Sequence, residues 1–295
     1  MLKSKIFLSL LLLLIPLLSF PVAAEVISSR VDLQGVSRIQ MDGSSELYFT
    51  QGDDEYVKIT AEREILDTVD ARVKGNLLHL SRKRQGWGSF NPPAQIRFDV
   101  QLQDLSQLRV NGAGDVVLGK LEAADLSVVL SGSCDLKLDT LKTGDFRLKM
   151  NGSSDLEAAA IETKLSQVRV FGSGKLNIEG VATDRLDIVV SGSGDIDVAR
   201  LEAEEIEITI NGSGDINLSG VVEHQRLEVN GSGKYHAPEL HSRTAEIEVN
   251  GSGNVEVSVE EHLSTFLSRG GEVTYHAGPD LEIETGGSGK VRRAD

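Results

Sequence analysis

Cysteine and aromatic residues are scarce in this sequence of 295 residues. The single cysteine, Cys134, excludes an intramolecular disulfide, and aromatic residues make up 4% of the chain, with one tryptophan. The six histidines have no cysteine partners and no helical pair spacing, so the sequence lacks the usual zinc motifs. We therefore predict no metal site and no cofactor.

Long apolar runs are confined to the N-terminal part of the chain. Residues 6–15 are apolar except for Ser9, follow Lys3 and Lys5, and precede a small-residue site that ends at Ala24. This pattern is typical of a secretory signal peptide. A retained anchor is disfavoured because no basic flank follows the run. We expect cleavage of residues 1–24, no membrane anchor afterwards, and export to a bacterial periplasm or exterior.

Positive charge is also in short supply, with 30 Lys and Arg against 45 Asp and Glu. The predicted leader carries two of the basic residues and none of the acidic ones, which leaves 28 against 45 and a net charge of −17. Such a balance disfavours nucleic acid and anionic lipid surfaces as partners.

A glycine-rich motif is present in abundance and recurs at a fixed period. Its first glycine returns at equal intervals from Gly112 to Gly212, and later copies stand at Gly231 and Gly251. Between motifs, apolar residues alternate with polar ones, as in Leu186, Ile188 and Val190, which is the pattern of half-buried strands.

A fixed short period with strand alternation predicts an all-β fold. Specifically, we expect a single-stranded, right-handed parallel β-helix with about 20 residues per coil. The motif glycines should face inward, at a corner without room for a side chain.

The predicted solenoid is a single domain that spans residues 25–295. Residues 105–295 hold the regular repeats, whereas residues 25–104 are expected to form irregular N-terminal coils with a long loop at residues 81–93. Strands are predicted at residues 57–60, 77–80 and 95–102. A separate small β-domain at the N-terminus is the alternative.

The motifs also resemble those of a known family. The repeats of the form Ser191-Gly192-Ser193-Gly194-Asp195, the closing Gly287-Ser288-Gly289-Lys290 and the opening residues 39–44 are similar to the bacterial family called putative auto-transporter adhesin, head GIN domain. The resemblance implies an exported β-helix with an adhesin label and no defined catalytic residues. The chain departs from the pattern at Cys134 and Ser154, which replace the second glycine, and at Arg269 in the ninth copy, so we expect a different corner in those coils.

The turn column is the first candidate site. In register, its residues stack along one edge about 5 Å apart. A cation- or saccharide-binding edge is one interpretation; the one we favour is a structural column whose side chains bond to their own and neighbouring coils. Its members are Gly112, Asp115, Gly132, Asp135, Gly152, Asp155, Gly172, Lys175, Gly192, Asp195, Gly212 and Asp215.

The loop at residues 81–93 is the second candidate, because it combines basic and aromatic side chains in an acidic protein. A ligand contact is one interpretation; the one we favour is a loop that is mobile or packs its aromatic side chains over the open solenoid end. If the protein binds a partner, this loop is the best candidate contact. Its proposed contact residues are Arg82, Lys83, Arg84, Trp87 and Phe90.

Two function classes remain open on the sequence alone. The first is a non-catalytic binding, adhesion or envelope-structural module whose partner is an envelope protein or glycan. The second is a polysaccharide-active lyase or hydrolase that uses paired carboxylates. We favour the first, because the sequence shows no insertions among the repeats that could build a catalytic cleft.

Overall fold

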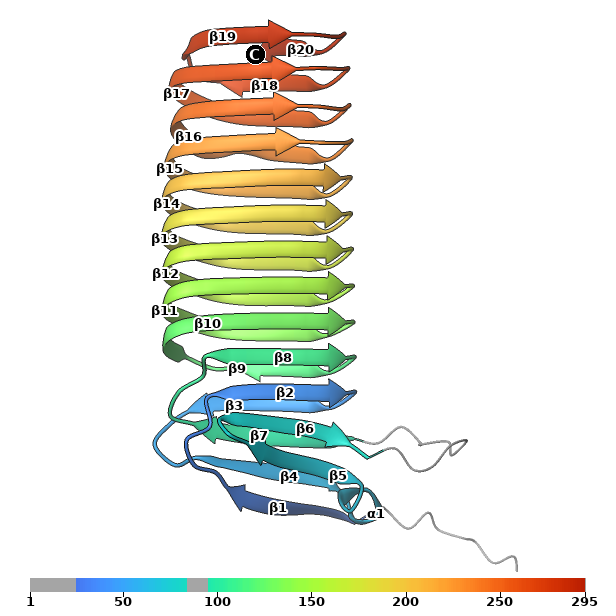
Figure 1. The fold of residues 1–295 in the computed structure, drawn as a ribbon. Coiled ribbons are helices and arrows are strands. Elements are labelled where there is room, and N and C mark those ends of the chain that lie inside the picture. The colour runs from blue at the N-terminus through green and yellow to red at the C-terminus, as the bar shows by residue number, and fades with distance from the viewer. Residues whose placement is uncertain (1–24, 84–94, 295) are drawn as a thin grey trace, which may run out of the picture.

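The computed structural model describes residues 25–83 and 95–294. These residues form twenty strands and one short helix, and all the strands belong to one continuous sheet network. None of the described residues belongs to a helix with the length and hydrophobicity needed to span a bilayer. Figure 1 shows a straight stack of flattened coils, with the glycine turns at its right edge.

The regular part of the stack is a parallel β-solenoid. Each strand pairs in parallel with the equivalent segment of the next coil, and the register from β11 to β14 is constant, so each coil takes one sequence repeat. This confirms the predicted all-β solenoid and its period. The strands are β8 (Gln107–Gly112), β9 (Asp115–Leu118), β10 (Leu121–Gly132), β11 (Asp135–Gly152), β12 (Asp155–Gly172), β13 (Lys175–Gly192), β14 (Asp195–Gly212), β15 (Asp215–Val229), β16 (Lys234–Val249) and β17 (Asn254–Leu267).

The core is made of columns of alternating apolar residues. Ile188 pairs with Ile208, and Ile208 pairs with Leu227 in the coil above. All three are at most 2% exposed, so they form one buried column. Each coil bends where two consecutive residues face outward, as at residues 199–200 and 204–205, and the alternation changes phase there. Each coil therefore has two such bends besides its glycine turn.

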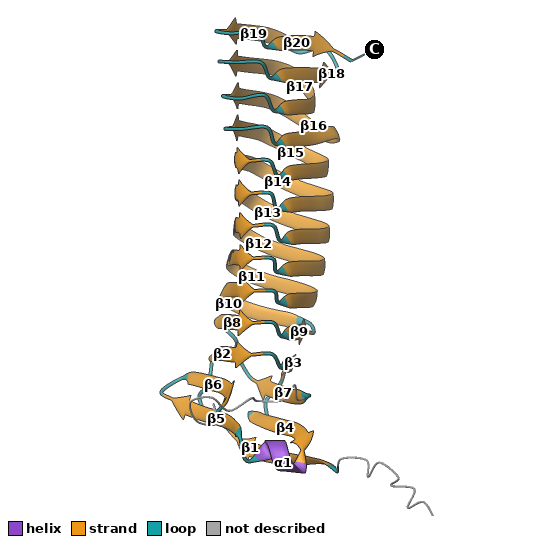
Figure 2. Ribbon diagram, turned by 90° about the vertical axis from the view of Figure 1, so that its right-hand side faces the viewer, coloured by secondary structure: helices purple, strands orange, loops and turns teal. Residues whose placement is uncertain are grey.

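Some repeats are shorter than 20 residues, and their missing residues lie at the bends and not at the glycine turn. The register shifts between Val198 and Leu201 as β14 meets β15, and a similar shift follows Ala237 as β16 meets β17. These irregularities lie at the bends across the coil, so Gly231 still lies directly above Gly212 although the repeat between them is shorter. The turns consequently form one continuous column, visible as aligned teal segments in Figure 2.

The N-terminal segment forms the lower end of the stack, but its strands are not stacked in chain order. Strands β2 and β3 make a coil directly beneath β8 and β9, whereas the later strands β6 and β7 lie one layer further down. Strands β1, β4 and β5 then close the end by antiparallel pairing. The bounds are β1 (Val26–Asp32), β2 (Arg38–Gly43), β3 (Glu46–Gln51), β4 (Tyr56–Glu62), α1 (Arg63–Leu66), β5 (Val69–Lys74), β6 (Leu77–Arg82) and β7 (Ile96–Leu102).

The predicted N-terminal strands are present, but the predicted loop begins too early. Strand β6 continues through Ser81, which pairs with Asp42 and Asp70, and Arg82, which pairs with Val69. The strand thus extends beyond the alternating residues 77–80, because both of its neighbours offer backbone partners there.

The C-terminal end has a different character from the N-terminal one. Strands β18 (Glu272–His276), β19 (Asp280–Thr285) and β20 (Lys290–Arg293) complete the uppermost coils. Leu281 and Ile283 occupy core columns but are 42% and 46% exposed, because no described strand lies above them.

The column structure predicts different effects for two adjacent residues. Ile188→Ala removes a buried side chain and should lower the free energy of unfolding by about 2–5 kcal/mol. Val189→Ala, on the outward face of the same strand, should change it by less than about 1 kcal/mol. Urea unfolding followed by circular dichroism would check this; equal losses for the two variants would contradict the inward and outward assignment.

Candidate functional site

The two glycines of each turn have different roles. Gly192 has a φ of +136°, and a Cβ there would lie 2.3 Å from the carbonyl oxygen of Gly172 in the coil below. Gly194 is buried, and a Cβ on it would lie 2.6 Å from Cγ1 of Val170 in the core. The expectation that both glycines face inward is therefore wrong for the first. The first glycine is needed because its φ is positive and because it contacts the backbone of the coil below. Only the second glycine is needed because the core has no room for a side chain there.

Coil-to-coil backbone hydrogen bonds explain why the turns stack so closely. The amide of Ser193 donates to the Gly172 oxygen at 2.9 Å, and that of Asp195 donates to the Gly174 oxygen at 3.1 Å. Two backbone hydrogen bonds, from Ser193 and from Asp195, therefore join this turn to the turn below it.

The coils that lack the second glycine keep the same turn. The amide of Asp155 donates to the Cys134 oxygen at 2.9 Å, as its equivalents do elsewhere. The side chains of Cys134 and Ser154 are fully buried, and the Ser154 hydroxyl donates to the Gly132 oxygen at 3.4 Å. The different corner expected at Cys134 and Ser154 is thus wrong, because the core accommodates these two small side chains without changing the backbone pattern.

The charged column predicted beside the turns is in register. Asp135 pairs with Asp115 below and Asp155 above, and Asp215 pairs with Lys234. Partial burial, with the neighbouring carboxylates of Asp115 and Asp155, raises the pKa of Asp135. This carboxyl is therefore harder to ionise than an isolated aspartate.

Some members of this column make the structural contacts that the sequence suggested. Oδ1 of Asp155 accepts a hydrogen bond from the backbone amide of Lys175 at 2.9 Å. Nζ of Lys234 lies 3.5 Å from Oδ2 of Asp215. Among the described residues, no group of three or more His, Cys, Asp or Glu side chains has a geometry suited to a metal ion.

The second predicted site lies only partly within the described residues. The guanidinium of Arg82 donates from Nε to Oγ1 of Thr68 at 3.2 Å, and the Lys83 amide donates to the Thr68 oxygen at 2.7 Å. Both residues thus join β6 to the start of β5. Arg84, Trp87 and Phe90 lie outside the described residues, so the proposed ligand contact stays a prediction.

Open grooves run along the rod between its outward columns. The first measures about 1220 Å³ and follows the bend at residues 122–124, 142–144 and their equivalents. Its floor is made of small residues such as Thr163, whose hydroxyl donates to the Gly144 oxygen at 2.7 Å. Acidic side chains prevail on its rims, namely Asp104, Glu122, Glu162, Asp184, Glu202, Glu204, Glu223 and Glu260, with Lys142, Lys164 and Arg243 among them.

A second groove of about 740 Å³ follows residues 117–119 and their equivalents in the next coils. Its floor includes Leu118, Leu138 and Ile178, and its rims carry polar and charged side chains such as Lys137. Both grooves extend over several coils, so an extended ligand would fit their shape better than a small one.

A cluster of three titratable residues, His236, Glu256 and His276, is a feature that the sequence patterns above did not identify. Nδ1 of His236 and Nε2 of His276 each lie 2.8 Å from the Glu256 carboxylate. The hydrogen bond from His276, with the charges of both histidines, holds the pKa of Glu256 below its ordinary value. His236 pairs with Glu256 in register, so the repeat period could have found these two residues. Glu256 pairs with Thr274 in the next coil, and His276 lies two residues further along that strand, so the period does not identify it.

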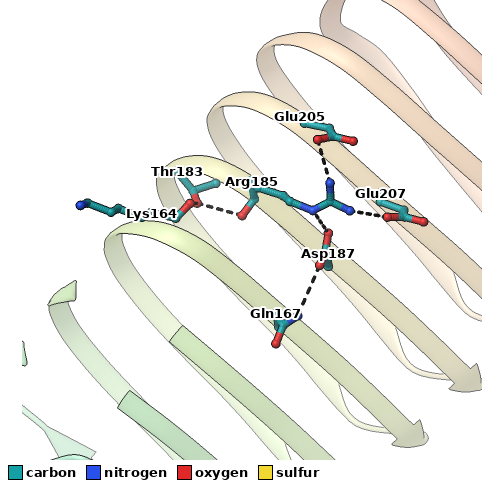
Figure 3. A network of polar contacts seen from close by, with 7 residues as sticks. All are labelled: Lys164, Gln167, Thr183, Arg185, Asp187, Glu205 and Glu207. Carbon is teal, nitrogen blue, oxygen red and sulfur yellow. Dashed lines mark hydrogen bonds and ion pairs between the residues drawn. The ribbon is translucent and has the colours of Figure 1, made fainter. Parts of the chain in front are cut away.

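A four-residue ion cluster joins β13 to β14 (Figure 3). Arg185 donates from Nε to Asp187 at 2.7 Å and from Nη1 to Glu205 at 2.8 Å, and Nη2 reaches Glu207 at 2.5 Å. The hydrogen bond to Asp187, with the charges of the three carboxylates, raises the pKa of Arg185. One guanidinium thus bridges three carboxylates from two coils, which links β13 to β14.

Comparison with known proteins agrees with the fold. The family described as putative auto-transporter adhesin, head GIN domain, matches residues 36–198 and again residues 161–279. No curated protein matches the chain.

Two solved structures resemble the chain over most of its length. A putative adhesin from Parabacteroides merdae ATCC 43184 is 17% identical, with a TM-score of 0.54, over 92% of this chain and 97% of that one. A putative adhesin from Parabacteroides distasonis ATCC 8503 is 21% identical, with a TM-score of 0.50, over 92% and 98% respectively. At this identity the likeness establishes the fold alone.

The turn geometry predicts a large difference between two glycine-to-alanine variants of one coil. Gly192→Ala combines a positive φ with a 2.3 Å approach to backbone and should cost a few kcal/mol, roughly 2–4. Gly180→Ala is the matched control, since its nearest atom would lie 3.8 Å away. Thermal and urea unfolding would check this, and an unchanged melting temperature for Gly192→Ala would contradict the close contact between turns.

The raised pKa of Asp135 predicts that replacing this carboxyl group increases the stability of the folded chain in a pH-dependent way. A carboxyl group with a higher pKa in the folded than in the unfolded chain is destabilising once ionised, so stability falls as pH rises from the unfolded pKa through the folded one. Asp135→Asn should therefore raise the urea midpoint at pH 7, and the gain should vanish near about pH 3, where aspartate is protonated in both states. Asp195→Asn, whose neighbour Lys175 is basic, should show no such gain. A lower midpoint for Asp135→Asn at pH 7 would argue against the repulsion.

Proposed function

We propose that this chain, which belongs to the putative auto-transporter adhesin, head GIN domain family, is an exported, non-catalytic binding module of the adhesin type. Family membership supports a role in adhesion or binding. The finer part of the proposal is that the partner is an envelope glycan or an envelope protein, met in the periplasm or at the cell surface.

The observation that carries the proposal is the uninterrupted regularity of the rod. From β8 to β20, coil follows coil, and each connection is only a few residues long. The outward surface therefore consists of flat sheet faces and open grooves that run over several coils. Such surfaces suit an extended partner that makes many weak contacts, and they offer little to enclose a reacting group.

A polysaccharide-active enzyme remains the second candidate, because the first groove carries many carboxylates. Acid and base catalysis requires two carboxyl groups with separated pKa values in a cleft that excludes water. The rim carboxylates of this groove are spread along successive coils of an open surface. This arrangement favours the binding proposal over the enzyme.

The proposal predicts binding without turnover. The purified protein should bind isolated bacterial envelope material in a pull-down, and incubation with acidic polysaccharides should release neither reducing ends nor unsaturated sugars. Release of either product, lost on mutation of a groove pair such as Glu202 and Glu204, would refute the non-catalytic function.

The loop contact predicted from the sequence has its own test. Trp87→Ala should weaken attachment to envelope material more than Asp195→Asn does, because an aromatic ring beside basic groups offers apolar area and charge-assisted donors. Quantitative pull-down of the two variants would check this. A stronger loss with Asp195→Asn would assign the contact to the turn column instead.

A further inference from the structure

Charge is unevenly distributed along one face of the rod. This face consists of β8 and the last residues of β10 to β14, in front in Figure 1. In the four coils at residues 107–111, 127–131, 147–151 and 167–171, the outward positions hold no Asp or Glu, although the protein has 45 of them. We call the outward side chains of these four segments the basic face. Its cations are Arg109, Arg147, Lys149 and Arg169.

The upper half of the same sheet has the opposite charge. Outward positions in the coils above carry Asp187, Glu207, Glu228, Glu246 and Glu248, together with Arg226, which forms an ion pair with Glu246. The basic face is therefore a local feature of four coils, and the acidic coils above it confine any anionic partner to it.

Three of these cations have no carboxylate partner among the described residues. Arg147 is neutralised by Asp145, whose Oδ2 lies 2.6 Å from Nη2. Arg109, Lys149 and Arg169 form no ion pair within residues 25–83 and 95–294. This contrasts with Arg185 in the next coil, which contacts three carboxylates (Figure 3).

The cations form a row because of the register. Arg109 and Lys149 each pair with Val129, and Lys149 pairs with Arg169. All three alternate with buried neighbours, so their side chains leave the same face. Adjacent coils lie about 4.8 Å apart, so the row presents positive charge at intervals of one or two coils along the rod.

An exposed aromatic ring adjoins the row. Phe171 is 38% exposed, although phenylalanine is usually buried, and Nζ of Lys149 lies 5.2 Å from its ring centre. Asn151 and Ser131 lie in the same column as the ring, so amide and hydroxyl groups flank it. A flat ring, cations and small polar groups together can contact the apolar face, the acid groups and the hydroxyls of a sugar.

We infer that the basic face binds a linear acidic polysaccharide laid along the rod axis. The inference rests on the proposed binding function and assigns to it a ligand class and a surface. Carboxylates on successive sugars contact Arg109, Lys149 and Arg169, while one sugar ring stacks on Phe171. Single-stranded nucleic acid fits less well, because it needs several aromatic rings in succession and the row offers one.

The test uses three soluble polymers and the intact protein. Polygalacturonate is the acidic sugar polymer, dextran the neutral one, and polyglutamate the acidic polymer without sugar rings. Affinities are measured by isothermal titration calorimetry in low and in physiological salt. The variants are Lys149→Gln with Arg169→Gln, and Phe171→Ala; the matched control is Lys58→Gln with Lys120→Gln, two exposed cations away from the face.

The parent protein should bind polygalacturonate, with weaker binding in higher salt and none to dextran. Neutralising Lys149 and Arg169 should weaken this binding about tenfold or more, since each lost charged contact is a sizeable part of the affinity. The control pair should stay within about twofold of the parent. Phe171→Ala should weaken binding of polygalacturonate several-fold and leave any binding of polyglutamate unchanged.

Several results would overturn the inference. Absence of saturable binding to polygalacturonate would do so, as would equal affinity for polyglutamate, which would show that sugar is not recognised. Equal affinity of the Lys149 and Arg169 variant would reject this surface and leave the binding function standing, whereas cleavage of the polymer would reject the binding function itself. A dimer in light scattering that dissociates in that variant would assign the face to self-association with the acidic half of a second copy.

Discussion

The hydrogen bonds between successive coils are the interaction on which the rest of the structure depends. They require every segment to lie about 4.8 Å above its equivalent, and the glycine turn is where this requirement is strictest. There Gly192 passes so close to the Gly172 carbonyl that no side chain fits between them. The turn column is therefore fixed, and the shorter repeats take up their missing residues at the opposite bends.

This constraint explains what could be predicted from the sequence. The regular return of the motif glycine predicts the register between coils. The alternation of Leu186, Ile188 and Val190 predicts the buried columns. Both the repeat period and the alternation can be seen in a single sequence. The prediction that Gly192 faces inward was wrong for a related reason. Parity alone cannot show that a residue with positive φ reverses the alternation, so an exposed turn glycine and a buried one look alike in sequence.

The ends of the stack were harder to predict, since they have a neighbour on one side only. Nothing in residues 38–51 indicates that β6 and β7, which come later in the chain, lie beneath them. The order is decided by how β1, β4 and β5 cover the open core with antiparallel pairs, and such pairs leave no periodic signal. His236 and Glu256 are the opposite case: they pair in register, and they were overlooked because histidines were sought as metal-ligand motifs. The third member of the cluster, His276, lies two residues beyond the position that pairs with Glu256.

Some positions are constrained by the fold and others are not, and this difference bears on function. Inward columns and turn glycines are held by packing and by backbone contact, whereas an outward residue can change its charge at a cost of a few tenths of a kcal/mol. A β-solenoid can therefore carry a pattern of charge on its faces that its fold does not require. Arg185 shows the arrangement that structure favours, a cation enclosed by carboxylates of its own and the adjacent coil. Lys149 and Arg169 depart from it on a face without acidic residues, which is the reason to look for their counterions in a partner.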